Sequence, residues 1–255
     1  MRLELTFDDP MLEPRIREVL PPGWTPARSD PRSASFVLRE TGPDSYQVTI
    51  GGAPAVEHAS LEVALTLLDS QMRLSIAANA RDWLFVHAGV VAVEDRALLI
   101  PGATFTGKTT LVHALVQAGA TYYSDEYAVL DDAGAVHPYP RPLSIRSGDG
   151  NSSRERRAGP AGRIAASDER ARAAAVVITR YRAGVVWRPR RLTSGQGMLA
   201  LLANTVPAQA RPEESLRALG RAIAGATTLE GDRGDAGPVA TALLDELAAL
   251  PHRNA

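Results

Sequence analysis

The chain has 255 residues, 45% of them hydrophobic, and a formal net charge of −1 at neutral pH. This length and composition suffice to bury a full α/β core, alone or with a small appendage. The near-neutral charge argues against a general nucleic-acid binder, and the absence of cysteine excludes disulfides, zinc–thiolate sites and thiol catalysis. No run approaches the roughly 18 apolar residues of a membrane helix. The N-terminus lacks a signal-like apolar stretch, so we expect a cytoplasmic protein that binds neither membrane nor nucleic acid.

The first 80 residues are divided by prolines into short segments. Aromatic and β-branched residues predict two strands, at 35–39 and 45–50, joined by a turn around Gly42-Pro43-Asp44. Apolar residues at helical spacing predict an amphipathic helix over 61–74. Nothing in this region carries a recognisable chemistry. We therefore expect residues 1–80 to form a small N-terminal α/β extension, or a docking module for a substrate, beside a second domain over residues 81–255.

A predicted hairpin comes next. Residues 86–93 and 96–100 are typical of buried strands, and Glu94-Asp95 between them forms the turn. This pairing puts His87 at the end of the hairpin far from the turn, beside the loop that follows residue 100. A histidine there can hydrogen-bond a catalytic carboxylate or a phosphate. A purely structural histidine is the alternative.

That loop contains the strongest signal in the chain. Residues 102–109 fit the phosphate-loop pattern G-x-x-x-x-G-K-[ST]. Among 28 lysine and arginine residues, Lys108 is the only lysine, and a compact ammonium on a flexible stem can reach a β- or γ-phosphate. A helix over 109–118 points free backbone N–H groups at an anion, and the Thr109 hydroxyl suits Mg²⁺. The residues expected to hold ATP and Mg²⁺ here are Gly102, Ala103, Thr104, Phe105, Thr106, Gly107, Lys108, Thr109 and Thr110.

Two adjacent carboxylates follow the helix. Asp125 and Glu126 lie within or at the end of a predicted strand in residues 121–130. Neighbouring side chains of a strand point to opposite faces, so one carboxylate can hold the metal while the other approaches an acceptor hydroxyl. A solvent-exposed acidic turn is the alternative. The next acidic pair, in Asp131-Asp132-Ala133-Gly134, is typical of a turn between strands.

Arginines later in the chain are candidates for anion contacts. Arg141 lies between Pro140 and Pro142, which restrict its backbone, and we expect it to contact a phosphate. Residues 147–162 are polar and glycine-rich, typical of a basic loop that closes over an anion or of a solvated surface loop. Arg233-Gly234-Asp235 is interpreted as a loop tripeptide, with a nucleotide-side role for Arg233 as the less favoured hypothesis.

The remaining pattern predicts strands and helices in alternation. Strands are predicted at 174–180 and 184–189, and helices at 198–206 and 213–225.

These residues together resemble the HPr kinase/phosphorylase group, and most of all its shorter HPr-kinase-like serine kinases. The resemblance rests on His87-Ala-Gly-Val-Val, the loop through Lys108, Tyr-Ser-Asp125-Glu126 and Pro140-Arg141-Pro-Leu-Ser. The phosphate loop is also similar to that of phosphoenolpyruvate carboxykinase, which shares the core. The resemblance covers roughly residues 82–146 and implies an α/β fold with a P-loop kinase core of this type.

The resemblance also implies roles. Asp125 corresponds to the acid that takes the proton from the acceptor serine, His87 to a histidine that assists it, and Glu126 to a metal-associated acid. Lys108 and Thr109 match the phosphate-binding lysine and the metal-binding hydroxyl. The expected function is an ATP- and Mg²⁺-dependent kinase acting on a serine of a protein or precursor peptide.

Other functions stay open at this point. A nucleotide-binding regulatory or scaffold protein is one alternative, because Phe105 and Glu126 replace a glycine and an aspartate of the family pattern. A small-molecule kinase is another. Homo-oligomer formation also stays open.

Overall fold

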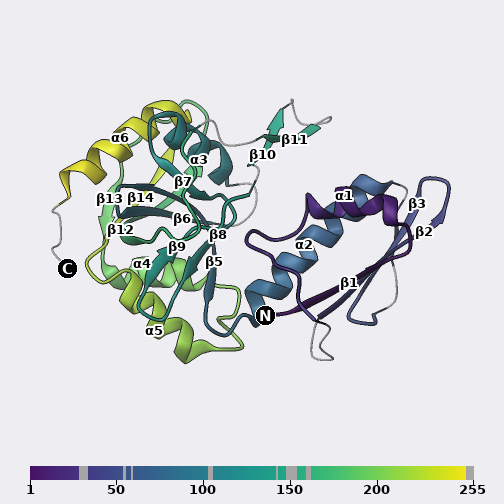
Figure 1. Ribbon diagram of the computed structural model, residues 1–255. Coiled ribbons are helices and arrows are strands. Elements are labelled where there is room, and N and C mark those ends of the chain that lie inside the picture. Colours follow the sequence, from purple (N-terminus) through teal and green to yellow (C-terminus); the bar gives the residue numbers. More distant parts are fainter. Residues whose placement is uncertain are drawn as a thin grey trace. The chain divides into compact units, whose positions relative to one another are not determined.

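The computed structural model describes residues 1–28, 34–53, 56–58, 60–102, 106–141, 143–147, 154–158 and 162–250. Residues 143–147 and 154–158 are described by their backbone alone. The chain divides into two compact units, residues 1–81 and residues 82–255. Both combine a sheet with helices, so the protein belongs to the α/β class (Figure 1). In the described part of the chain, no helix is both long enough and apolar enough to cross a membrane.

The first unit is a four-stranded sheet in the order β1-β2-β3-β4, with one long helix packed on it. Strands β1 and β2 are parallel, whereas the β2–β3 and β3–β4 pairs are antiparallel. The core contains Phe36 and Leu38 from the sheet and Leu68 and Met72 from the helix. The elements of this unit are β1 Leu3–Phe7, a 3-10 helix Pro10–Leu12, α1 Glu13–Arg17, β2 Ala34–Gly42, β3 Ser45–Ile50, β4 Val56–His58 and α2 Leu61–Asn79.

The predicted hairpin at 35–39 and 45–50 is confirmed by β2 and β3. The predicted helix is confirmed but continues five residues further, to Asn79. It begins where the Ser60 side chain accepts a hydrogen bond from the Val63 amide, a typical N-terminal cap.

The second unit is built around an eight-stranded mixed sheet. Its order is β13-β14-β12-β6-β5-β8-β9, with β7 paired to β5 beside β8. The central strands β6, β12 and β14 are parallel, so their carboxyl ends meet at one edge, where ligands bind in open α/β sheets. The elements are β5 Leu84–Val93, β6 Arg96–Pro101, α3 Lys108–Gln117, β7 Thr121–Ser124, β8 Tyr127–Leu130, β9 Ala135–His137, β10 Leu143–Ser147, β11 Arg154–Ala158, β12 Ala171–Tyr181, β13 Arg190–Leu192, α4 Ser194–Leu202, α5 Pro212–Ala222, β14 Thr227–Arg233 and α6 Ala236–Ala249.

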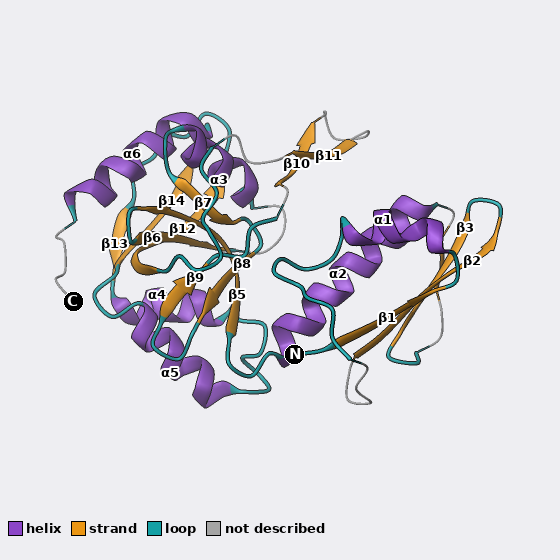
Figure 2. Ribbon diagram, viewed as in Figure 1, coloured by secondary structure: helices purple, strands orange, loops and turns teal. Residues whose placement is uncertain are grey.

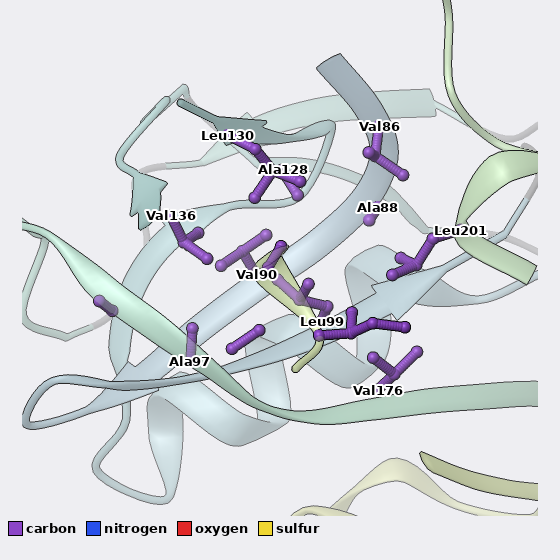
Figure 3. Close-up of a cluster of buried hydrophobic side chains, with 14 of the residues drawn as sticks. Val86, Ala88, Val90, Ala97, Leu99, Ala128, Leu130, Val136, Val176 and Leu201 are labelled. Atoms are coloured by element: carbon purple, nitrogen blue, oxygen red, sulfur yellow. The ribbon is translucent and has the colours of Figure 1, made fainter. Parts of the chain in front are cut away.

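Helices cover both faces of this sheet (Figure 2). Even-numbered residues of β5, such as Val86 and Val90, join Leu99 of β6 and Leu201 of α4 in one core cluster (Figure 3). The opposite face, which includes Leu98 of β6, packs against α3 and α6. Strict alternation of this kind is expected for strands buried on both faces of a three-layer α/β sandwich.

Gly89 of β5 sets how closely α3 approaches the sheet. A Cβ on Gly89 would lie 2.5 Å from Cγ2 of Val112, so an alanine at this position would force Val112 or its helix to shift. The helix that follows the phosphate loop is therefore held directly against β5.

Several elements differ from the sequence-based expectations. No strand forms over 184–189, because Gly184 turns the chain with φ of +75° and the next strand, β13, starts at Arg190. Helix α4 begins four residues earlier than predicted, at Ser194, because Thr193 and Gln196 form a capping box. Helix α5 spans Pro212–Ala222, three residues short of the predicted end.

The segment expected to be a loop contains strands as well. Within residues 147–162, residues 154–158 form β11, which pairs antiparallel with β10 just before the segment, so a purely irregular loop is wrong for this part. Residues 148–153 and 159–161 lie outside the described part of the chain.

Candidate functional site

The phosphate loop begins where β6 ends and finishes at the start of α3. Pro101 pairs with Ala88 of β5, and the amide of Gly102 donates to the His87 carbonyl at 3.4 Å. Helix α3 begins at Lys108, with Gly107 as its N-cap in the left-handed conformation at φ +83°. Strand, loop and helix thus follow one another as predicted, and α3 presents its free N-terminal amides at the end of β6. Ala103, Thr104 and Phe105 lie outside the described residues.

Lys108 is buried at the first turn of α3, with 8% of its surface exposed. Its Nζ donates to the carbonyl of Gly102 at 2.5 Å, so the side chain folds back over its own loop. Burial lowers the pKa of Lys108, while Glu126 and Asp125 act in the opposite direction. The lone lysine therefore lies between the loop and the two acids. Thr110, further along the same turn, is exposed.

Asp125 and Glu126 interrupt the strand that pairs with β5. Strands β7 and β8 lie end to end along β5, with Ser124 opposite Val90 and Tyr127 opposite His87. In the interruption, the buried Ser124 hydroxyl accepts hydrogen bonds from the amides of Glu126 and Tyr127, at 3.1 and 3.0 Å. The two acids are thus held in a tight turn with a strand on either side, rather than in the middle of a strand.

Asp125 faces the phosphate-loop helix. Its carboxylate accepts a hydrogen bond at 2.9 Å from the hydroxyl of the fully buried Tyr122. Burial raises the pKa of Asp125, and Glu126 adds to this effect, while the nearby hydroxyls of Tyr122 and Thr109 oppose it. A carboxyl group in this environment holds a proton more readily than an exposed one, which suits a group that exchanges a proton.

Glu126 faces His87. The Nε2 atom of His87 lies 3.6 Å from Oε1 of Glu126, and both side chains are partly exposed. The hairpin predicted from the sequence is present and puts His87 beside the loop, as expected. The contact that the structure shows for His87 is with Glu126, whereas the family resemblance assigned this histidine to Asp125. Asp125 is hydrogen-bonded by Tyr122, a residue that the sequence pattern indicated only as part of a strand.

Arg141 contacts the site through its backbone carbonyl. Its carbonyl accepts a hydrogen bond at 2.9 Å from the same Tyr122 hydroxyl that contacts Asp125. The chain around Arg141 is therefore tied to the acid turn, although the sequence pointed to its guanidinium.

Arg233 is the second residue that the preferred sequence interpretation missed. It is the last residue of β14, only 2% exposed, and not part of a surface loop. Its Nη2 donates to the carbonyl of Gly107 at 2.7 Å. The signal that could have identified it is the β-branched and apolar run of residues 227–229, which predicts a strand leading to Arg233 at the sheet edge.

The residues present suit a nucleotide phosphate with Mg²⁺. No three His, Cys, Asp or Glu side chains gather as a metal cluster within the described ranges. Mg²⁺ needs only one or two carboxylates when phosphates and waters supply its other ligands. The Thr109 hydroxyl and the Asp125 carboxylate, which lie near each other, provide oxygen donors of the right kind beside the loop, and Glu126 follows directly.

No protein-family model matches the chain, and no curated protein matches it at a significant level.

Proposed function

We propose that the chain is an ATP- and Mg²⁺-dependent kinase that transfers a phosphoryl group to the hydroxyl of a serine in a protein or peptide. The HPr-kinase-like serine kinases are the family that its motifs resemble. The observation that carries the proposal is the alignment along β5, which pairs with β6 before the phosphate loop and with β7 and β8 on either side of Asp125 and Glu126. The loop that would hold the donor phosphates therefore lies beside the acid that would receive the acceptor serine.

Each side chain has a task in this proposal. Lys108 and the N-terminal amides of α3 hold the phosphate oxygens of ATP and stabilise the charge that develops on them. Thr109 and Glu126 would hold Mg²⁺, which would screen the charge of the phosphates. Asp125 accepts the proton of the serine hydroxyl while the Oγ–P bond forms, the bond to the leaving oxygen breaks, and ADP departs. His87 orients Glu126 through their contact.

The environment of Asp125 supports its role. Burial raises its pKa, which makes it a stronger base than an exposed aspartate. The hydrogen bond from Tyr122 fixes the carboxylate in one orientation, so little rearrangement is needed when the acceptor arrives. The proposal places the reaction in residues 82–255, and residues 1–81 serve as an extension or docking module.

Titration calorimetry with Mg-ATP tests the phosphate site. Lys108→Ala removes a charge-assisted contact, and we expect its affinity to fall by at least about tenfold. Unchanged affinity in a folded Lys108→Ala protein would contradict the phosphate-loop interpretation.

Transfer of labelled γ-phosphate to serine peptides encoded by neighbouring genes tests the chemistry. In Asp125→Asn, Mg-ATP binding should survive while transfer falls by about 10² or more, the usual effect of losing a general base. Asp132→Asn is the matched control, since this exposed acid lies in the following turn and its loss should leave transfer unchanged. A wild-type protein that binds Mg-ATP tightly but phosphorylates none of these peptides would favour the regulatory alternative.

A further inference from the structure

Arg233 lies at the carboxyl edge of the parallel strands, next to the phosphate loop. It pairs in register with Tyr181, the last residue of the neighbouring strand β12. Its guanidinium lies 5.6 Å from the centre of the Tyr181 ring. One nitrogen, Nη2, donates to the Gly107 carbonyl at 2.7 Å, and the other, Nη1, donates to the Gly234 carbonyl at 3.0 Å. The side chain is therefore fixed between β14, β12 and the N-cap of α3.

The positive charge of Arg233 lacks a counter-charge. Among the described residues, no carboxylate forms an ion pair with it, and its Nε is buried without a hydrogen-bond partner. The nearest acid in sequence, Asp232, pairs with the exposed Arg182 at 3.2 Å. A charge that is 98% buried is normally paired, because removing an ion from water costs several kcal/mol. An unpaired buried cation beside a helix N-terminus points to an anion as its missing partner.

We propose that Arg233 is a second cation of the phosphate site, which positions Gly107 and whose charge is compensated by the bound phosphates. This inference rests on the phosphate-binding part of the proposed function. It adds to the proposed phosphate site a residue that lies 126 positions after Gly107 in the chain. Arg233 keeps the N-cap of α3 in the conformation that exposes its amides. A phosphate at these amides lowers the electrostatic cost of the buried guanidinium, so binding and positioning reinforce each other.

Calorimetry with two probes, Mg-ATP and magnesium tripolyphosphate, tests this role on the full chain. Tripolyphosphate has no base or ribose, so it reports on the phosphate site alone. In Arg233→Met, which keeps the length of the side chain but not its charge, both affinities should fall by about ten- to a hundredfold. The matched control is Arg182→Met, which removes an exposed and already paired arginine from the same sheet edge. It should change either affinity by less than about twofold.

Each outcome decides between definite alternatives. A wild-type chain that binds neither probe would overturn the proposed function itself. A wild type that binds both, with Arg233→Met binding equally well, would overturn only the role of Arg233. If Arg233→Met lowers the melting temperature but leaves the affinity unchanged when measured on the folded variant, Arg233 has only a structural role.

If Arg233→Met does not fold, Arg233→Lys is the deciding variant, because it keeps the positive charge but not the two hydrogen bonds of the guanidinium. We expect a loss of about three- to tenfold, and wild-type affinity would refute the proposal.

Discussion

Replacing Gly107 with alanine has two physical effects, and Gly184 allows them to be separated. The backbone φ is +83° at Gly107 and +75° at Gly184, so an alanine is strained to a similar degree at both positions. At Gly184, an added Cβ meets no atom within 4 Å. At Gly107, it lies 2.6 Å from Nη2 of Arg233, so the guanidinium must move and its hydrogen bond to the Gly107 carbonyl is lost.

The expected losses follow from these contacts. A left-handed conformation costs a residue other than glycine about 1–2 kcal/mol, which is the whole effect expected for Gly184→Ala. A hydrogen bond from a charged donor contributes about 1.5–3 kcal/mol more. Gly107→Ala should therefore lower the free energy of unfolding by roughly 2.5–5 kcal/mol.

Denaturant unfolding followed by tryptophan fluorescence measures both variants. In a Trp24→Phe background, the remaining tryptophans, Trp83 and Trp187, both lie in the second unit and report on it alone. Linear extrapolation then gives the free energy of unfolding for each variant. Equal losses for Gly107→Ala and Gly184→Ala would refute the reasoning, because they would show that Arg233 contributes nothing measurable at the loop.

Three further predictions concern the acids, the histidine and the strand beneath them. Because burial raises the pKa of Asp125, the folded unit binds that proton more tightly than the unfolded chain and loses stability as pH rises through the folded pKa. Asp125→Asn should therefore raise the melting temperature at pH 8 and lose this advantage toward pH 4; a gap that does not vary with pH would contradict the assignment. His87→Gln should slow phosphoryl transfer, because it removes the contact that orients Glu126; a destabilised variant that still transfers phosphate at the wild-type rate would make His87 structural. Gly89→Ala should lower unfolding free energy by about 1–3 kcal/mol through its clash with Val112, and Val112→Ala in the same chain should restore most of the loss; no rescue in the thermal melt of the double variant would place the strain elsewhere.

The parts of the site predicted from the sequence are those fixed by short-range geometry. The turn at Glu94-Asp95 determines the register of β5 and β6, which brings His87 to the phosphate loop. The spacing from Gly102 to Thr109 determines how the loop meets α3. Both depend on residues fewer than about 25 positions apart, and the pattern of apolar residues alone determines them.

The contacts that were not predicted depend on the order of strands in the sheet. Arg233 reaches Gly107 across 126 positions of the chain, because β14 lies beside β12 and β12 lies beside β6. Nothing in the sequence near Arg233 specifies these neighbours. Tyr122 resembles an ordinary strand aromatic, and only the turn at Ser124 brings Asp125 back to its hydroxyl.

Strand β5 also makes the site sensitive to strand register. It pairs with β6 on one side and with β7 and β8 on the other, so the loop and both acids are aligned against the same backbone. A slip of one residue would turn His87 into the core that Val86 and Val90 now fill, and would expel these valines. The alignment of the proposed catalytic groups is thus maintained by the burial of apolar side chains outside the site. Core substitutions in β5 that keep the fold but loosen its register should therefore impair transfer more than they impair stability.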